Sequence, residues 1–160
     1  MVFSDAVGDD DIWWLDISGT QQNDKPSRLI SSTKRESLPQ FSSDGRKIAF
    51  RSLRTGNAEI WVSDSGGTDL VQLTFFCGPL TGTPRWSPDG SQIAFDSRPE
   101  GNADIFVVRA SGGKPRRMTT DPAEDIVPSW SHDGKWIYFC SSRTGERQIW
   151  KMPSTGGDAI

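Results

Sequence analysis

Residues 39–45 read Pro-Gln-Phe-Ser-Ser-Asp-Gly, and this heptapeptide occurs three times in the 160-residue chain. It returns as Pro-Arg-Trp-Ser-Pro-Asp-Gly at residues 84–90 and as Pro-Ser-Trp-Ser-His-Asp-Gly at residues 128–134. The spacings are 45 and 44 residues. A fixed period of this length indicates that one supersecondary unit is copied along the chain. We therefore expect function to lie on a surface that the copies share.

Each copy continues in the same order after its Asp-Gly pair. A short apolar run, a polar loop, a second apolar pair and a Gly-Gly pair follow one another. The apolar runs are residues 47–50, 92–95 and 136–139, and the second pairs are Ile60-Trp61, Ile105-Phe106 and Ile149-Trp150. Short runs rich in Ile, Phe and Trp between Gly, Pro and Asp are typical of strands. Asp-Gly predicts a hairpin turn, and Pro suits the first residue of a strand.

The unit is therefore predicted to be four antiparallel strands, which is the blade of a β-propeller. The N-terminus holds a further copy without the heptapeptide, because Val2-Phe3, Ile12-Trp13 and residues 27–30 match its later strands. Residues 158–160 are too few for a fourth strand of the last copy. We predict an all-β propeller segment of about three and a half four-stranded antiparallel blades, with three, four, four and three strands in chain order and no substantial helix. The boundaries are a partial blade at 1–38, blades at 39–83 and 84–127, and a partial blade at 128–160.

The pattern Pro-x-Trp-Ser-x-Asp-Gly-x-x-Ile-x-Phe-x-Ser, followed by Gly-x-x-Asp-Ile-(Trp/Phe), resembles the TolB-type repeat, a WD-repeat-like blade. The resemblance covers essentially the whole chain. It implies a binding scaffold whose channel mouth docks a partner protein. The same repeats occur in the propeller domains of prolyl-oligopeptidase-like enzymes, in which catalysis is supplied by another domain.

Composition excludes several function classes. The net charge is −3, and the one clustered basic run is Lys114-Pro-Arg-Arg117, interpreted as a solvated edge, so nucleic-acid binding is not expected. No apolar segment approaches the roughly 20 residues of a membrane span. The first ten residues lack the basic and apolar regions of a signal peptide, and the compartment stays open, although family members are often periplasmic.

No catalytic constellation, metal site or cofactor is predicted. His132, the only histidine, falls in a turn. Cys77 and Cys140 lie two blades apart and are expected to be free thiols, with Cys140 a small core residue. The repeated Asp44, Asp89 and Asp133 are interpreted as caps of their own turns. Residues 9–11 are three adjacent Asp, for which a solvated loop is favoured over a calcium site. The seven Trp are interpreted as core residues between blades.

Residues that differ between the copies are the candidates for function. Gln40, Arg85 and Ser129 occupy one position of the first strand and are predicted to face the channel, with Arg85 able to hold a carboxylate. Phe75 and Phe76 lie in the loop before the strand of the second heptapeptide, either folded onto the blade or exposed as an anchor for a partner. These five residues form the predicted partner-binding site.

The predicted function is a non-catalytic scaffold that binds a protein or peptide at the channel mouth. The alternatives are the gating propeller of a prolyl-oligopeptidase-like hydrolase and a half-propeller without separate activity. Because rings close at about four to eight blades, an open arc of three and a half also predicts a homodimer that completes a ring.

Overall fold

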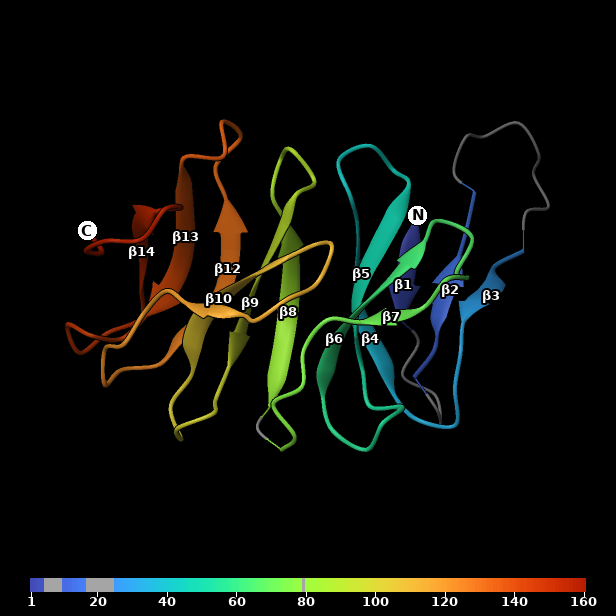
Figure 1. The fold of residues 1–160 in the computed structure, drawn as a ribbon, viewed down its shortest axis with the longest axis horizontal. Helices are drawn as coiled ribbons and strands as arrows, with labels where there is room; N and C mark the ends of the chain where they lie inside the picture. Colours follow the sequence, from blue (N-terminus) through green and yellow to red (C-terminus); the bar gives the residue numbers. More distant parts are fainter. Residues whose placement is uncertain (5–9, 17–24, 79) are drawn as a thin grey trace.

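The computed structural model describes residues 1–160 apart from 5–9, 17–24 and 79. The described residues form fourteen strands in four antiparallel sheets, which stand side by side along the long axis of the molecule (Figure 1). The first sheet contains β1 (Val2–Ser4), β2 (Ile12–Trp14) and β3 (Ser27–Ile30). The second contains β4 (Glu36–Phe41), β5 (Lys47–Ser52), β6 (Glu59–Asp64) and β7 (Val71–Gln72).

The third and fourth sheets repeat this plan. The third contains β8 (Thr81–Trp86), β9 (Gln92–Ser97), β10 (Asp104–Arg109) and β11 (Arg116–Arg117). The fourth contains β12 (Asp125–Trp130), β13 (Trp136–Ser141) and β14 (Gln148–Pro153). Strands pair in chain order within every sheet, so the predicted series of three, four, four and three strands is confirmed.

The described residues contain no helix, and so none that could cross a membrane. The chain is an open arc of propeller blades, and each sheet is one blade, numbered here from one to four. Strand β4 packs against β8, and β8 packs against β12, which places the first strands of consecutive heptapeptide copies side by side along one shared edge.

The Asp-Gly hairpins have the predicted capping. The Ser42 hydroxyl donates to Asp44 Oδ1 at 2.6 Å, and the same oxygen accepts the Arg46 backbone N–H at 3.1 Å. Gly45 has φ +69°, a conformation that glycine adopts without a steric cost. The other two hairpins have the same bonds at Asp89 and Asp133. These hydrogen bonds lower the pKa of each carboxyl, the serine hydroxyl being the largest cause.

The prediction that proline begins each blade is wrong. Pro39, Pro84 and Pro128 are the fourth residues of β4, β8 and β12. The register of each strand shifts just before the proline, and the preceding residue has a positive φ: 57° at Leu38, 46° at Thr83 and 55° at Val127. A β-bulge therefore interrupts the ladder at this point, where a residue without an N–H loses no hydrogen bond.

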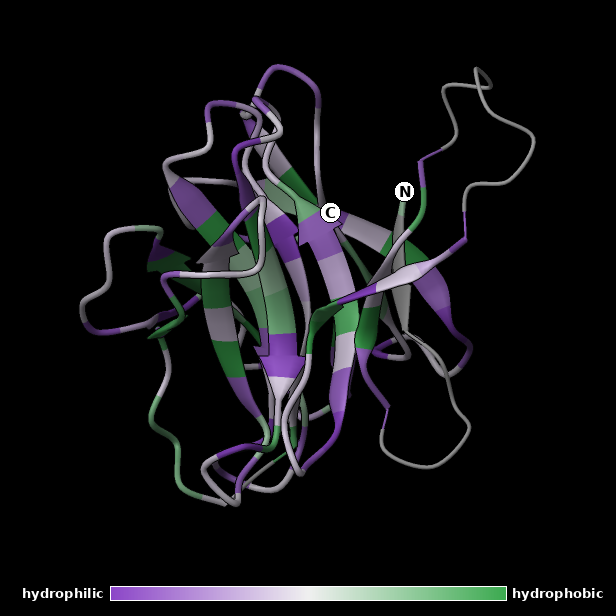
Figure 2. Cartoon of the chain, turned by 90° about the vertical axis from the view of Figure 1, so that its right-hand side faces the viewer, coloured by the Kyte–Doolittle hydropathy of each residue, from purple (hydrophilic) through white to green (hydrophobic). Residues whose placement is uncertain are grey.

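Apolar side chains fill the space between neighbouring sheets. Figure 2 shows that many residues along the strands are hydrophobic. Between blades two and three, Ala49, Ile60 and Val62 pack with Phe95 and Phe106. An equivalent cluster joins blades three and four, and a third joins blades one and two. Trp86 is a core residue as predicted, whereas Trp14 is 38% exposed and contacts Phe41 edge-on.

Two acidic side chains are buried just before β2, where the sequence indicated a solvated loop, and each pairs with a more exposed arginine. Asp10 and Asp11 are buried; Asp10 pairs with Arg35, and Asp11 pairs with Arg28 at 3.0 Å. The prediction of a solvated acidic loop is therefore wrong for these two residues, while Asp9 lies outside the described residues. Asp11 occupies the position of Glu59 and Asp104, which begin β6 and β10, so its burial follows from the repeat.

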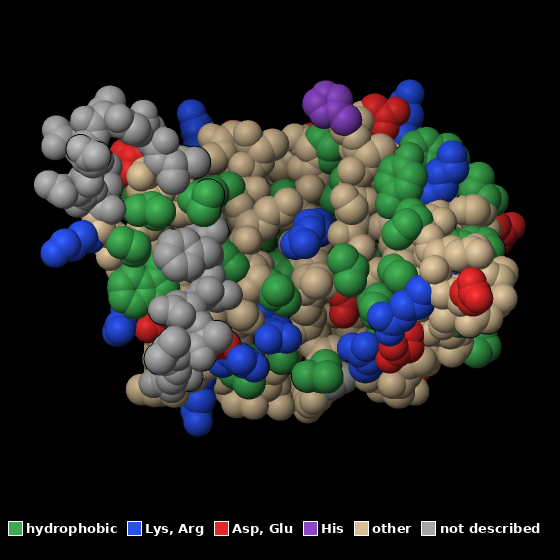
Figure 3. All heavy atoms as spheres, turned by 180° about the vertical axis from the view of Figure 1, so that it is seen from behind, with side chains coloured by type: hydrophobic (Ala, Val, Ile, Leu, Met, Phe, Trp, Pro, Cys, Tyr) green, Lys and Arg blue, Asp and Glu red, His purple; other side chains and the backbone are tan. Residues whose placement is uncertain are grey.

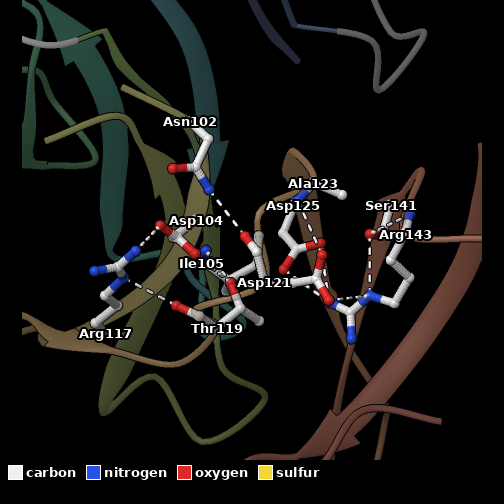
Figure 4. Close-up of polar contacts among 10 residues, drawn as sticks. All are labelled: Asn102, Asp104, Ile105, Arg117, Thr119, Asp121, Ala123, Asp125, Ser141 and Arg143. Carbon is white, nitrogen blue, oxygen red and sulfur yellow. Dashed lines mark hydrogen bonds and ion pairs between the residues drawn. The ribbon is translucent and has the colours of Figure 1, made fainter. Parts of the chain in front are cut away.

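Figure 4 shows two further ion pairs, one in the third blade and one in the fourth. Arg117 bonds Asp104 Oδ2 at 2.5 Å and Glu100 at 2.6 Å, so the basic run at 114–117 is not simply a solvated edge. Arg143 bonds Asp125, whose side chain is fully buried, at 2.8 Å. The Arg143 guanidinium also lies over the Trp150 ring at 4.8 Å. These contacts fix the polar loops to the strands beneath them.

Candidate functional site

A cavity of about 420 Å³ opens where the shared edge of the blades meets the Asp-Gly hairpins. Gln40 from β4, Arg85 from β8 and Ser129 from β12 line it together. The aromatic residues that follow them in each strand complete its wall, and hairpin residues form its rim. These further residues are Phe41, Trp86, Trp130, Ser43, Pro88 and His132. Three of the five predicted site residues therefore line one cavity.

The wall of this cavity is held by hydrogen bonds between blades. The Trp86 indole N–H donates to the Gln40 carbonyl oxygen at 3.1 Å, and the Trp86 backbone N–H donates to Gln40 Oε1 at 2.8 Å. The Trp130 indole N–H donates to the Arg85 carbonyl oxygen at 3.0 Å. Each tryptophan thus fixes the candidate residue of the preceding blade, and the site is built on rigid strands.

Arg85 is a half-buried cation without an acidic partner among the described residues. Its Nη1 donates to the neighbouring Pro84 carbonyl oxygen at 2.9 Å, and no carboxylate of the described chain lies within 4.0 Å of its charged nitrogens. Arg98, in contrast, bonds Glu124 at 3.0 Å. A guanidinium has donors for two carboxylate oxygens, so Arg85 retains the capacity to bind an anion.

A second half-buried arginine was missed from the sequence. Arg51 on β5 donates to Ser37 Oγ at 3.0 Å, and burial followed by the nearby charge of Arg35 lowers its pKa. Asp96 holds the equivalent position on β9, is 8% exposed, and has a pKa raised chiefly by burial. The sequence did contain a signal for these two residues: one position of the second strand varies between the copies, with Arg at 51, Asp at 96 and Cys at 140.

Phe75 and Phe76 are not part of the cavity. They precede β8, whereas Arg85 is the residue before its last, so the two groups lie at opposite ends of that strand. Phe76 packs against Phe106 with ring centroids 5.3 Å apart and against Phe95 at 6.1 Å. Phe75 is 69% exposed. The Phe76 ring therefore packs the loop against the blade, whereas the Phe75 ring faces solvent.

Cysteine and histidine placement adds no chemistry to the cavity. Cys77 is exposed and Cys140 half-buried, and both are free thiols as expected; Cys140 is not the core residue that was predicted. His132 is exposed at the rim. On the side shown in Figure 3, hydrophobic side chains form scattered patches, and basic side chains lie near the middle and along the lower edge.

Residues 24–160 match the family model of the TolB beta propeller domain. Among solved structures, TolB from Acinetobacter baumannii is similar at 28% identity with a TM-score of 0.79, covering 99% of this chain and 40% of that one. A putative TolB from Agrobacterium tumefaciens is similar at 25% identity with a TM-score of 0.78, covering 92% of this chain and 53% of that one.

A structure from a study of two prolyl endopeptidases aligns at 16% identity with a TM-score of 0.66, covering 95% of this chain and 26% of that one, and shows the fold alone. No curated protein sequence matches the chain. The chain thus spans about half, or less, of the length of the TolB structures it resembles.

Proposed function

Because the chain belongs to the TolB β-propeller domain family, we propose that it is a binding scaffold for a protein or peptide. The partner contacts the cavity formed by Gln40, Arg85 and Ser129 at the hairpin end of the shared edge. The observation that carries this proposal is the half-buried Arg85 guanidinium, which has no carboxylate partner among the described residues. We assign no catalytic step to the chain.

The chemistry of the cavity favours a carboxylate-bearing peptide segment. Arg85 supplies charge, while the rings of Trp86 and Trp130 supply rigid apolar walls. Tryptophan and arginine are the residues in which binding energy most often concentrates. Exposed Phe75 gives a separate apolar contact at the opposite end of β8, outside the cavity, for a partner large enough to reach it.

Replacing Arg85 by Ala tests the proposal through capture of partners from a cell lysate. Arg109→Ala is the matched control, because Arg109 is exposed at the end of β10 and lies outside the cavity. We expect the Arg85 variant to lose proteins that the wild-type chain and the control retain. Equal capture by all three chains, with unchanged circular dichroism, would remove Arg85 from the site.

Self-association is a second proposal, favoured by the outward face of blade four. Ile149 is 72% exposed and Tyr138 36% exposed, whereas their equivalents in blade three, Ile105 and Ala94, are fully buried against blade four. A second copy placed against this face would bury it and supply further blades. Light scattering at micromolar concentration should then report twice the chain mass, and a monomeric mass would exclude the dimer.

A further inference from the structure

The turn between the third and fourth strands of blade two binds an anion that belongs to the chain itself. The Asp64 carboxylate accepts the Thr68 backbone N–H at 2.7 Å and the Thr68 hydroxyl at 2.8 Å. These bonds, with the N–H groups of Gly66 and Gly67, lower the pKa of Asp64, and the Thr68 hydroxyl is the largest cause. Gly67 has φ +79°, and its N–H closes the turn on the Asp64 carbonyl oxygen at 3.1 Å. The backbone of this turn is therefore shaped to hold one carboxylate.

Blade three has the same turn without the carboxylate. Arg109 ends β10 as Asp64 ends β6, so it occupies the same position. Gly112 has φ +90°, and its N–H donates to the Arg109 carbonyl oxygen at 2.9 Å, so this turn is closed in the same way. Gly113 is the counterpart of Thr68, and its N–H has no acceptor among the described residues. The backbone donor that binds Asp64 in blade two is therefore available in blade three.

Basic side chains surround the blade-three turn. A cavity of about 350 Å³ is formed there by Gly112, Gly113, Arg109, Lys114 and Arg116, together with Gln92 and Val107. None of its three cations forms an ion pair with a carboxylate of the described chain. Arg116 is also fixed in place, because its guanidinium donates to the carbonyl oxygens of Ser154 and Thr155 at 3.0 and 2.9 Å. The cavity therefore combines a free backbone N–H with positive charge that nothing in the described chain neutralises.

This basic character distinguishes blade three from the other two blades whose turn the structure describes. The positions of Arg109, Lys114 and Arg116 hold Asp64, Asp69 and Val71 in blade two, and Pro153, Asp158 and Ile160 in blade four. Arg117, the next residue of the basic run, bonds Asp104 and Glu100 instead, because successive side chains of a strand point to opposite faces. The three cations are thus not required to build the turn, and their convergence calls for a ligand.

We propose that this cavity binds a phosphate group, which takes the place that the Asp64 carboxylate has in blade two. The Gly113 N–H donates to one phosphate oxygen, and Lys114 and Arg116 balance the charge. A phosphate group carries about 1.5 to 2 negative charges at neutral pH, so it matches two cations better than a carboxylate with a single charge does. Arg109 contributes mainly by bringing no carboxylate of its own.

The test adds inorganic phosphate to the ¹⁵N-labelled full chain at pH 7 and constant ionic strength, because salt screens exposed charges. We expect saturable chemical-shift changes at the amides of Gly113 and Lys114, with a dissociation constant of about 1 mM or below. Potassium chloride at the same ionic strength should not cause them. Glycerol 3-phosphate in a parallel titration separates two sources of the group. Similar affinity for both probes assigns the site to phosphate monoesters as well, whereas binding of inorganic phosphate alone assigns it to the free anion.

Two substitutions at one position make the test specific. Arg109→Asp should abolish the response, because it restores the blade-two carboxylate at the place proposed for phosphate. Arg109→Ala leaves that place open and should weaken binding by only about two- to fivefold, the contribution of one exposed charge. Lys114→Ala should weaken it by a similar factor. Lys34→Asp makes the same two-unit change of charge at an exposed side chain outside the cavity and should bind like the wild type.

The proposal is overturned if Arg109→Asp binds phosphate as tightly as Arg109→Ala does. It is equally overturned by shifts that chloride reproduces, by shifts confined to other parts of the chain, or by no saturation up to roughly 10 mM phosphate. Arg109 and Lys114 are exposed, so these variants should keep the fold, which their amide spectra report directly. Failure here leaves the Arg85 proposal untouched, because the two cavities share no residue.

Discussion

The indole N–H of Trp130 donates to the backbone carbonyl oxygen of Arg85 at 3.0 Å, and so links two blades at the candidate site. Trp86 and Gln40 repeat the link one blade earlier. The tryptophan of each heptapeptide therefore serves both the core and the neighbouring blade. Arg85 is thus positioned by Trp130, which lies 45 residues later in the sequence.

Trp130→Phe should destabilise the chain while leaving the ring packing in place. The loss of one hydrogen bond is expected to cost about 1 kcal/mol. Urea unfolding followed by circular dichroism measures the difference. Trp136→Phe is the control, because that half-buried ring contacts Lys151 at 4.6 Å and does not link two blades. A Trp130 variant as stable as the control would contradict the interblade role.

Arg143→Met should destabilise the chain by about 3–5 kcal/mol, because it leaves the buried Asp125 carboxylate without its cation. The variant keeps the side-chain length but not the charge. Arg147→Met is the control: its side chain is 67% exposed and 3.9 Å from Glu124, so a change below about 0.5 kcal/mol is expected. Equal denaturation midpoints for the two variants would show that the Arg143 pair contributes no more than a surface contact.

Asp96 and Asp89 should give opposite pH dependence. Burial raises the pKa of Asp96 above its ordinary value of 3.8, so the folded state binds the proton more tightly than the unfolded state. Stability from this group is present below pH 3.8 and is lost as pH rises through the folded pKa. The stability of Asp96→Asn relative to wild type should therefore increase as the pH rises from 3.8 through the folded-state pKa of Asp96.

The Ser87 hydroxyl, followed by the Ser91 N–H, lowers the pKa of Asp89 below 3.8. Its contribution is present above pH 3.8 and is lost as pH falls through the folded pKa. Asp89→Asn should thus lose stability relative to wild type at neutral pH and approach it in acid. Unfolding free energies of both variants between pH 3 and pH 7 check the two signs together. Parallel curves for the two variants would refute the assignment.

Val127→Asn should stabilise blade four. Val127 is β-branched and has φ 55° in the bulge before Pro128, so its backbone is strained. Its side chain is 49% exposed, so burial offsets little of that strain. Asn tolerates this backbone region, and a gain on the order of 1 kcal/mol is expected. Val127→Ala is the comparison, since it removes the branching but keeps the steric conflict. Thermal unfolding that ranks Asn below Ala would contradict a strained bulge.

The repeat predicted the four sheets and their strand numbers because the strands and turns within each copy are determined by nearby residues in the sequence. The heptapeptide also located the capped hairpins at Asp44, Asp89 and Asp133 correctly. The bulge before each proline was missed, since proline is compatible both with a strand's first residue and with an unpaired position inside it. Only the hydrogen-bond pattern of the folded strand distinguishes these two positions; the residue type does not.

The candidate site was predicted only in part. Gln40, Arg85 and Ser129 meet because equivalent positions of consecutive blades must lie on one edge. Phe75 and Phe76 were grouped with them because both sets vary between copies, but they lie at the other end of β8. Asp10 and Asp11 were predicted to be solvated because three adjacent carboxylates usually are. In the structure both are buried, and each pairs with an arginine later in the chain.

The most direct test of the central claim is NMR titration of the full chain with a short acidic peptide, acetyl-Gly-Asp-Gly-Asp-Gly-amide. The reporters are the indole N–H signals of Trp86 and Trp130, which are bonded to the residues that line the cavity. We predict that both signals shift with the Asp peptide, shift much less with the matched Asn peptide, and stop responding in Arg85→Gln. Indole signals that respond equally to the two peptides, or that respond equally in the Arg85 variant, would contradict a carboxylate-binding site at this cavity.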